Sequence, residues 1–175
     1  SVNETCRNIS VTCIAPTKTF NLAGLQTAAV YAENRVLHHK MWRRLNTDEV
    51  AEPNAFAVCA TVAAFTYGEE WLDQLREYIE GNKQYVTEYI KKEIPQMKVV
   101  NSEATYLMWL DISSLTTDSD AMYAFIRKTS GLYLASGREY GSNGDGFLRL
   151  NVATNRANVE DGMRRLKKSV EAYVK

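Results

Sequence analysis

The clearest hydrophobic pattern in the sequence lies near its middle and predicts one long helix. Apolar side chains recur there at helical spacing while charged and amide side chains fill the other face; the apolar positions are Trp71, Leu75, Tyr78, Ile79, Val86, Tyr89 and Ile90. Pro95 ends the segment, because proline cannot continue a helix. We therefore expect an amphipathic helix over residues 69–95 that connects two lobes.

Beyond this helix, the pattern predicts a small α+β unit. Runs rich in apolar residues predict strands over residues 106–112, 131–136 and 147–152, and helical spacing predicts a helix over 118–129. A last helix is expected from Asn158, with Asp161 at the capping-box position. Its predicted buried stripe consists of Val159, Met163, Leu166, Val170 and Tyr173.

The pattern before the long helix is less regular. Residues 9–14 predict a short buried strand, residues 25–33 a second strand, and residues 34–47 a loop with a short helix. Residues 53–67 are Ala-rich and apolar on most sides, which predicts a buried helix.

Composition narrows the possible functions. The 175 residues are 45% hydrophobic, as in a soluble globular protein, and 21 basic side chains balance 21 acidic ones. Zero net charge argues against nucleic acid or an anionic membrane as a partner, and no apolar run could span a membrane. Cys6, Cys13 and Cys59 lack paired spacing, so we expect neither a disulfide framework nor a metal site, and a cytoplasmic setting.

Lys18 is the first candidate for chemistry. It directly follows a predicted buried strand and has Pro16, Thr17, Thr19 and Phe20 as neighbours, whereas most lysines lie on charged surfaces. An amine close to apolar groups is less well solvated as an ammonium ion, which favours its use as a nucleophile. Schiff-base chemistry requires such an amine.

Four blocks of the sequence carry a resemblance to a known family. They are CIAPTKTFNLAGL at 13–25, GEEWLDQLREYI at 68–79, TYLMWLD at 105–111 and GFLRLN at 146–151. In order and spacing, they resemble the class I/II aminotransferase family of fold-type I pyridoxal-phosphate enzymes, and most closely its C–S lyase branch of cystathionine β-lyase-like proteins.

The resemblance implies an α/β fold and a division of the chain. Residues 1–68 would be the end of the large pyridoxal-phosphate-binding domain, 69–95 the interdomain helix and 96–175 the small C-terminal domain. It further implies a homodimer acting on amino acids, with pyridoxal 5'-phosphate bound to Lys18. The family residues that would precede Lys18, some two hundred or more, are not in this sequence, so we expect a fragment that alone is inactive and that self-associates or is loosely ordered in its first part.

Arg149 is the second candidate. It lies in the middle of a predicted strand, where an unpaired arginine between apolar neighbours is costly, so an internal salt bridge is the ordinary explanation. The resemblance implies a different role, in which the planar guanidinium binds the α-carboxylate of the substrate.

Thr17 stands next to the lysine, and two positions depart from the aminotransferase pattern. The Thr17 hydroxyl could donate to the cofactor phosphate, as the resemblance implies, or stabilise a turn. Many aminotransferases have a phosphate-binding serine and arginine where this chain has Ala15 and Gln26. This departure favours the lyase branch, which would release a thiol, ammonia and pyruvate; an aminotransferase or a non-catalytic regulator remain alternatives.

Other polar or aromatic features have ordinary explanations. His38 and His39 are adjacent and would point apart, which makes a poor metal pair. The Gly-rich segment 141–146 leads into a strand, whereas a phosphate-binding loop needs a helix N-terminus there. We expect Tyr106 and Trp109 to serve in packing.

Overall fold

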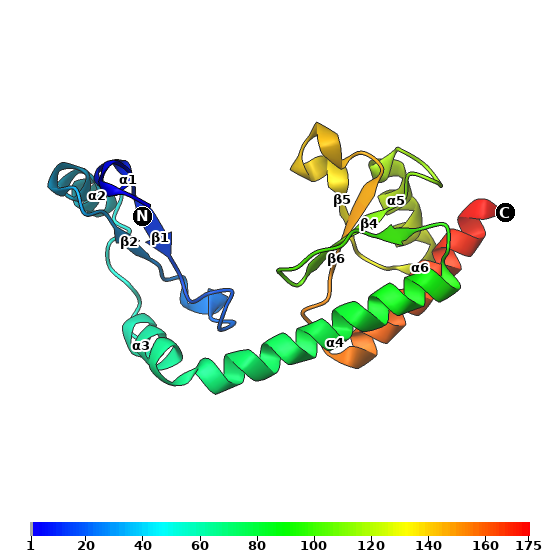
Figure 1. Ribbon diagram of the computed structural model, residues 1–175, viewed down its shortest axis with the longest axis horizontal. Helices are drawn as coiled ribbons and strands as arrows, with labels where there is room; N and C mark the ends of the chain where they lie inside the picture. The colour runs from blue at the N-terminus through cyan, green and yellow to red at the C-terminus, as the bar shows by residue number, and fades with distance from the viewer. Residues whose placement is uncertain (1) are drawn as a thin grey trace. The chain divides into compact units, whose positions relative to one another are not determined.

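The computed structural model describes residues 2–175, and the chain divides into two compact units, Ser1–Leu75 and Arg76–Lys175 (Figure 1). The division falls inside the long helix α4, which runs from Glu69 to Glu93. The three-part division into residues 1–68, 69–95 and 96–175 stays a prediction.

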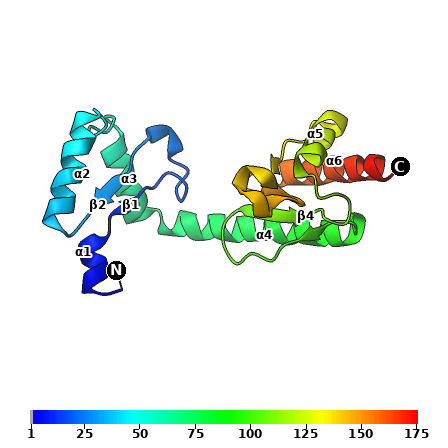
Figure 2. The ribbon, with the colours of Figure 1, turned by 90° about the horizontal axis from the view of Figure 1, so that it is seen from above.

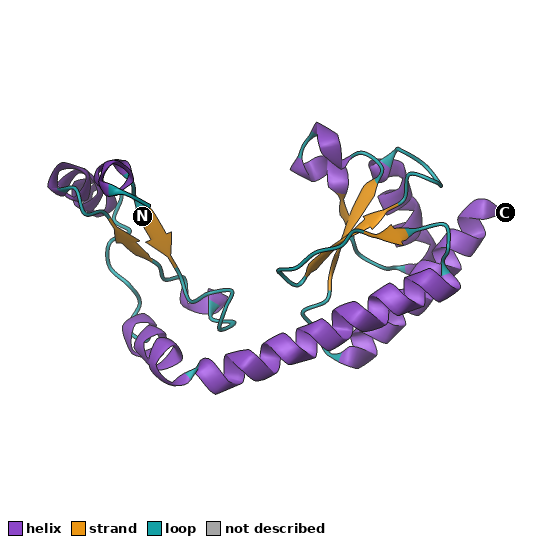
Figure 3. Ribbon diagram, viewed as in Figure 1, coloured by secondary structure: helices purple, strands orange, loops and turns teal. Residues whose placement is uncertain are grey.

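The second unit combines a four-stranded sheet with three helices (Figure 3). Beyond α4, its elements are β3 (Lys98–Val99), β4 (Leu107–Asp111), α5 (Ser119–Ser130), β5 (Ala135–Ser136), η2 (Gly137–Tyr140), η3 (Ser142–Gly144), β6 (Phe147–Asn151) and α6 (Arg156–Val174). The strand order is β3-β4-β6-β5, and every neighbouring pair is antiparallel. The predicted strands at 106–112 and 147–152 correspond to β4 and β6, whereas the one at 131–136 is reduced to the two residues of β5.

One face of this sheet forms the core. Side chains alternate along β4 and β6, so Met108, Leu110, Leu148 and Leu150 are buried while their neighbours in sequence are only partly covered. Helices α4, α5 and α6 supply the rest of the core with Val86, Ile90, Met122, Ile126, Val159, Met163, Leu166 and Val170. In both orientations α4 and α6 lie side by side (Figures 1 and 2). The other sheet face therefore holds the side chains available for a site.

Two details of the last helix differ from the prediction. Its N-cap is Asn155, whose side chain accepts a hydrogen bond from the Asn158 backbone amide at 2.9 Å, so Asn158 already lies inside the helix. Asp161 is bound by Arg165, with 2.5 Å between Oδ2 and Nε, and this hydrogen bond lowers the pKa of the Asp161 carboxyl. Tyr173 lies at the exposed edge of the predicted stripe.

The first unit contains two strands and several helices. They are α1 (Glu4–Ile9), β1 (Thr12–Ile14), η1 (Ala23–Leu25), β2 (Ala29–Tyr31), α2 (Arg35–Thr47) and α3 (Ala57–Tyr67). β1 and β2 pair only with each other, antiparallel, with Cys13 opposite Val30. The expectation of strands filling 9–14 and 25–33, the first of them buried, was wrong for this chain, because only Thr12–Ile14 and Ala29–Tyr31 are strands and β1 is exposed.

Helix α3 was predicted to be buried, and most of it is not. Ala57 is fully buried, but Val58, Val62 and Phe65 form an exposed apolar stripe. Within the first unit, the Phe20 ring contacts Phe65, but Val58, Val62 and Phe65 each remain more than half exposed, so α3 has the hydrophobic composition of a buried helix with little cover.

Candidate functional site

Lys18 lies at the tip of a tight turn that follows β1. The turn is closed by backbone hydrogen bonds from Phe20 N to Pro16 O at 2.9 Å and from Leu22 N to Thr17 O at 3.0 Å. The Lys18 side chain is exposed, and no carboxylate among residues 2–175 lies within ion-pair distance of it. The apolar surroundings expected for this amine are thus not provided by the residues of its own turn.

A close contact with the α3–α4 junction holds this turn in place. The Phe20 ring packs edge-on against Phe65, with 5.3 Å between ring centroids, and lies 6.3 Å from Trp71. Gly68 permits this approach: a Cβ there would lie 2.7 Å from Phe20 Cε1 and 2.4 Å from the Ala64 carbonyl oxygen. The sequence motif around the lysine is therefore coupled to the start of the long helix through Phe20.

Thr17 is half-buried beside Lys18, and no hydrogen bond of its hydroxyl to another described residue is seen. Its backbone carbonyl, not its side chain, stabilises the turn. Gln26 is exposed in the left-handed conformation with a φ of 48°, as the cap of η1. Among residues 2–175, no hydrogen-bond or ion-pair partner is seen for the Lys18 amine or the Thr17 hydroxyl, and both groups lie on one turn.

Arg149 lies at the centre of the open sheet face in the second unit. It is the middle residue of β6, directly opposite Trp109 on β4 and Ala135 on β5. Residues in register on neighbouring strands point to the same face. Arg149 is therefore half-buried between an aromatic ring and a small side chain.

The ordinary explanation for Arg149, an internal salt bridge, is not seen in residues 2–175. The β4 carboxylate on the same face, Asp111, is instead bonded to Ser113, and these hydrogen bonds lower the pKa of the Asp111 carboxyl. The partner of the Arg149 guanidinium is the ring of Tyr140, with 4.4 Å between Cζ and the ring centroid. Tyr140 was not recognised from the sequence.

Tyr140 is part of an aromatic pocket on this face. Its ring meets Trp109 edge-on at 5.4 Å and 88°, and Trp109 meets Phe147 at 6.4 Å. The pocket has a volume of about 250 Å³ and is completed by Val100, Asn143 and Gly144. Trp109 was expected to serve in packing; its ring does contact its neighbours, and it also lines this pocket.

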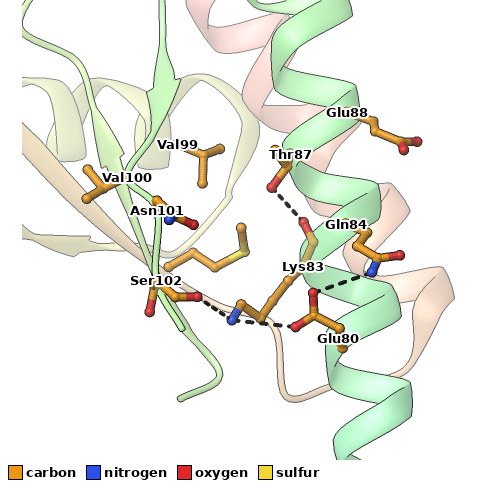
Figure 4. Close-up of a pocket in the computed structure, with 10 residues that line it drawn as sticks. Glu80, Lys83, Gln84, Thr87, Glu88, Val99, Val100, Asn101 and Ser102 are labelled. Atoms are coloured by element: carbon orange, nitrogen blue, oxygen red, sulfur yellow. Dashed lines mark hydrogen bonds and ion pairs between the residues drawn. The ribbon is translucent and has the colours of Figure 1, made fainter. Parts of the chain in front are cut away.

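A second, more polar hollow of about 370 Å³ lies between α4 and the segment after β3 (Figure 4). Lys83 reaches across it, donating to the Ser102 carbonyl at 2.9 Å and lying 3.7 Å from Glu80 Oε2. The Gln84 amide donates to Glu80, and the Thr87 hydroxyl donates to the Lys83 carbonyl. Because these polar groups bind one another, the hollow resembles a structural clamp more than a ligand site.

The remaining sequence features have no catalytic arrangement. The three cysteines are free thiols, and His39 lies 6.2 Å from Trp42, ring to ring. Across residues 2–175, no three His, Cys, Asp or Glu side chains gather as metal ligands, and no helix there is long and apolar enough to cross a membrane. The Gly-rich segment 141–146 carries η3 and leads into β6, not into a helix of the phosphate-binding kind.

Comparison with known proteins decides the family. The model of the family "Aminotransferase class I and II" matches residues 7–166, which is most of the chain. The chain belongs to the class I and II aminotransferase family. This confirms the resemblance inferred from the four sequence blocks.

Relatives of known sequence agree with the lyase branch of that family. The cystathionine beta-lyase PatB of Bacillus subtilis is 38% identical over 167 residues, which are 95% of this chain and 43% of PatB. The protein MalY of Escherichia coli is 30% identical over 156 residues, covering 89% of this chain and 40% of MalY. The chain thus spans less than half the length of these relatives.

Solved structures confirm the α/β transferase fold. Cystalysin from Treponema denticola, which contains pyridoxal 5'-phosphate, superposes with a TM-score of 0.93 at 25% identity and covers 98% of this chain and 44% of its own. The PLP-bound C–S lyase of Staphylococcus hominis gives a TM-score of 0.79 at 29% identity, over 91% of this chain and 42% of its own. In both cases the match covers under half of the longer chain.

Proposed function

We propose that this chain provides the cofactor-anchoring lysine and the carboxylate-binding arginine of a pyridoxal-phosphate-dependent C–S β-lyase. The observation that carries the proposal is the half-buried Arg149 on the open sheet face, whose guanidinium has no carboxylate partner among residues 2–175. An arginine kept in that setting without an ion pair fits an anion brought by a ligand.

Each proposed residue has a separate task. Pyridoxal phosphate, when bound, supplies an electron-poor ring that accepts the electron pair left at the substrate Cα. Lys18 Nζ would hold that group covalently and, once released, take the Cα proton as a general base. Thr17 would donate its hydroxyl to the phosphate. Arg149 would bind the α-carboxylate with two parallel N–H donors and so fix the direction of the bond to be broken.

The lyase reaction is favoured over amino transfer by the comparisons. PatB is named a cystathionine beta-lyase, and the C–S lyase of Staphylococcus hominis and cystalysin share the fold at 25% identity or more. The substrate would be an amino acid with a sulfur leaving group, such as cystathionine, and the products a thiol, ammonia and pyruvate. The relatives also include an aspartate aminotransferase of Pyrococcus horikoshii at 24% identity, which makes amino transfer to a 2-oxo acid the second candidate.

The anchoring role of Lys18 can be tested directly. The protein is incubated with pyridoxal phosphate and reduced with borohydride, and the labelled peptide is located by mass spectrometry. Label on the peptide containing Lys18, lost in Lys18→Ala and retained in Lys40→Ala, is the expected result, since Lys40 is an exposed lysine of α2. Equal labelling of Lys18→Ala and the parent would contradict the proposal.

A further inference from the structure

We infer that Tyr140 is a positioning residue, whose ring holds the Arg149 guanidinium ready for a carboxylate. The inference rests on the proposed function of Arg149 and adds a residue to it. Among residues 2–175, Tyr140 is the aromatic side chain over which the Arg149 guanidinium lies, with 4.4 Å from Cζ to the ring centroid.

The contact suits a cation that must also bind an anion. A guanidinium over a ring face is attracted by the negative charge density of that face. The attraction uses none of the N–H donors of Arg149, whereas a salt bridge to the protein would occupy them. An aromatic partner can therefore restrict the arginine side chain without competing with a ligand carboxylate.

The ring of Tyr140 is itself contacted by two side chains, Trp109 and Arg149. Trp109 meets it edge-on at 5.4 Å, and Trp109 is directly opposite Arg149 in the β4–β6 register. Tyr140 thus contacts both Trp109 and Arg149, which lie opposite each other on neighbouring strands, and both contacts limit the rotamers open to the Tyr140 ring. Ala135, the other neighbour of Arg149, leaves space beside it on the sheet face.

The backbone that carries Tyr140 is fixed by unusually close packing of η2 against η3. A Cβ on Gly144 would lie 1.9 Å from the Gly137 carbonyl oxygen, and a Cβ on Gly137 would lie 2.2 Å from that of Gly144. The fully buried Ser119 hydroxyl donates to the Gly144 carbonyl at 3.1 Å and accepts from the Phe147 amide at 3.1 Å. The Gly-rich segment thereby acts as a rigid support for Tyr140.

The test measures carboxylate binding in the 175-residue chain without cofactor. Sodium propionate is titrated at constant ionic strength, and the Arg149 side-chain Hε–Nε signal and the Trp109 indole N–H signal are followed by NMR. We expect Tyr140→Leu to weaken propionate binding about two- to fivefold, the size of an exposed cation–π contact. The Arg149 proton signals should also lose the upfield shift caused by the ring.

Two matched variants separate positioning from a general effect on the fold. Tyr140→Phe keeps the ring and should bind propionate like the parent. Tyr133→Leu removes an aromatic ring that holds another arginine of the same unit, Arg127, at 5.1 Å from its centroid, and should leave the Arg149 signals and the affinity unchanged.

Each outcome bears on one of the two claims. If Arg149→Gln loses propionate binding and Tyr140→Leu keeps it in full, the inference about Tyr140 is overturned and the proposed carboxylate site stands. If Arg149→Gln binds propionate as the parent does, the proposed role of Arg149 fails. If Tyr140→Phe weakens binding as much as Tyr140→Leu, the hydroxyl rather than the ring is responsible, which also overturns the inference.

Discussion

The two units of this chain have similar apolar compositions but bury them very differently. The second unit, Arg76–Lys175, encloses a continuous core between its sheet and helices α4, α5 and α6. In the first unit, the buried hydrophobic residues seen among those described are Ala32 and Ala57. Large apolar side chains such as Ile14, Val58, Val62 and Phe65 remain exposed there.

This difference shows which unit is able to hold its own structure. Burial of apolar area is the main favourable term in folding, and it must offset the entropy of ordering the chain. The second unit meets that requirement within its own residues. The first unit has the apolar composition of a buried layer. We therefore expect its exposed α3 stripe to need cover from other protein surface, such as that of a second copy of the chain.

The largest predicted effect compares the same substitution in both units. Val86 in α4 is fully buried, whereas Val62 in α3 is 59% exposed. Val86→Ala should lower the free energy of unfolding by about 2–3 kcal/mol, because it removes buried methyl groups and leaves a cavity. Val62→Ala should change it by less than about 0.5 kcal/mol, as surface substitutions do. Both sites are helical, so the intrinsic preference for alanine largely cancels.

Urea unfolding followed through the tryptophan indole signals measures this comparison. Trp109 reports on the second unit, and Trp42 and Trp71 on the first. A cost at Val62 as large as that at Val86 would mean that the α3 stripe is covered in solution, and the proposed contrast between the units would then be wrong.

A smaller effect is expected where the first unit does pack tightly. Gly68→Ala would place a methyl group 2.4 Å from the Ala64 carbonyl oxygen and 2.7 Å from the Phe20 ring. Relief of this overlap should cost about 1–3 kcal/mol and displace Phe20, with faster hydrogen exchange of the amides in the Lys18 turn. Gly24→Ala is the matched control, because a Cβ there meets nothing within 4 Å. Equal exchange rates in the two variants would show that Phe20 does not anchor the turn.

The same contrast explains which elements could be predicted from the sequence. A core that lies within the chain sets the hydrophobic patterns of β4, β6, α4 and α5. The spacing of their apolar residues in the sequence therefore agrees with which side chains are buried in the structure. In residues 25–33, the pattern has no such core to enforce it, and only Ala29–Tyr31 is a strand. The start of α6 was misplaced by three residues because Asn155 and Asn158 are both good caps, and composition does not choose between them.

The candidate site was only partly accessible to sequence reasoning. Lys18, Thr17 and Arg149 were identified through motifs, and their roles stay predictions. Tyr140 could not be found by periodicity, because its contact with Arg149 depends on two short turns packed through Gly137 and Gly144. Gly144 lies in the Gly-rich segment 141–146, which was considered only as a phosphate-binding loop, and Gly137 was not singled out; the close backbone packing between these two glycines was the missed signal.

The smallest predicted effect concerns an ion pair on the surface of the second unit. Lys167 of α6 donates to Glu93 of α4, with 2.6 Å between Nζ and Oε2. This hydrogen bond, with the charge of Lys167, lowers the pKa of the Glu93 carboxyl below its ordinary value of 4.5 and raises that of Lys167 above 10.5. The Glu93 contribution is therefore complete above pH 4.5 and is lost as the pH falls through the lowered value.

Replacing Glu93 by glutamine should remove this part of the acid dependence. The urea midpoint of Glu93→Gln should lie slightly below that of the parent near neutral pH, and the two should converge as the pH falls below about 4. Glu88→Gln, at an exposed position of the same helix, should run parallel to the parent throughout. Since the pair joins two helices that share the core of the second unit, its loss should leave the first unit's Trp42 and Trp71 signals unchanged. A shift of those signals with the Glu93 titration would mean that the two units unfold together, which the difference in their burial does not lead us to expect.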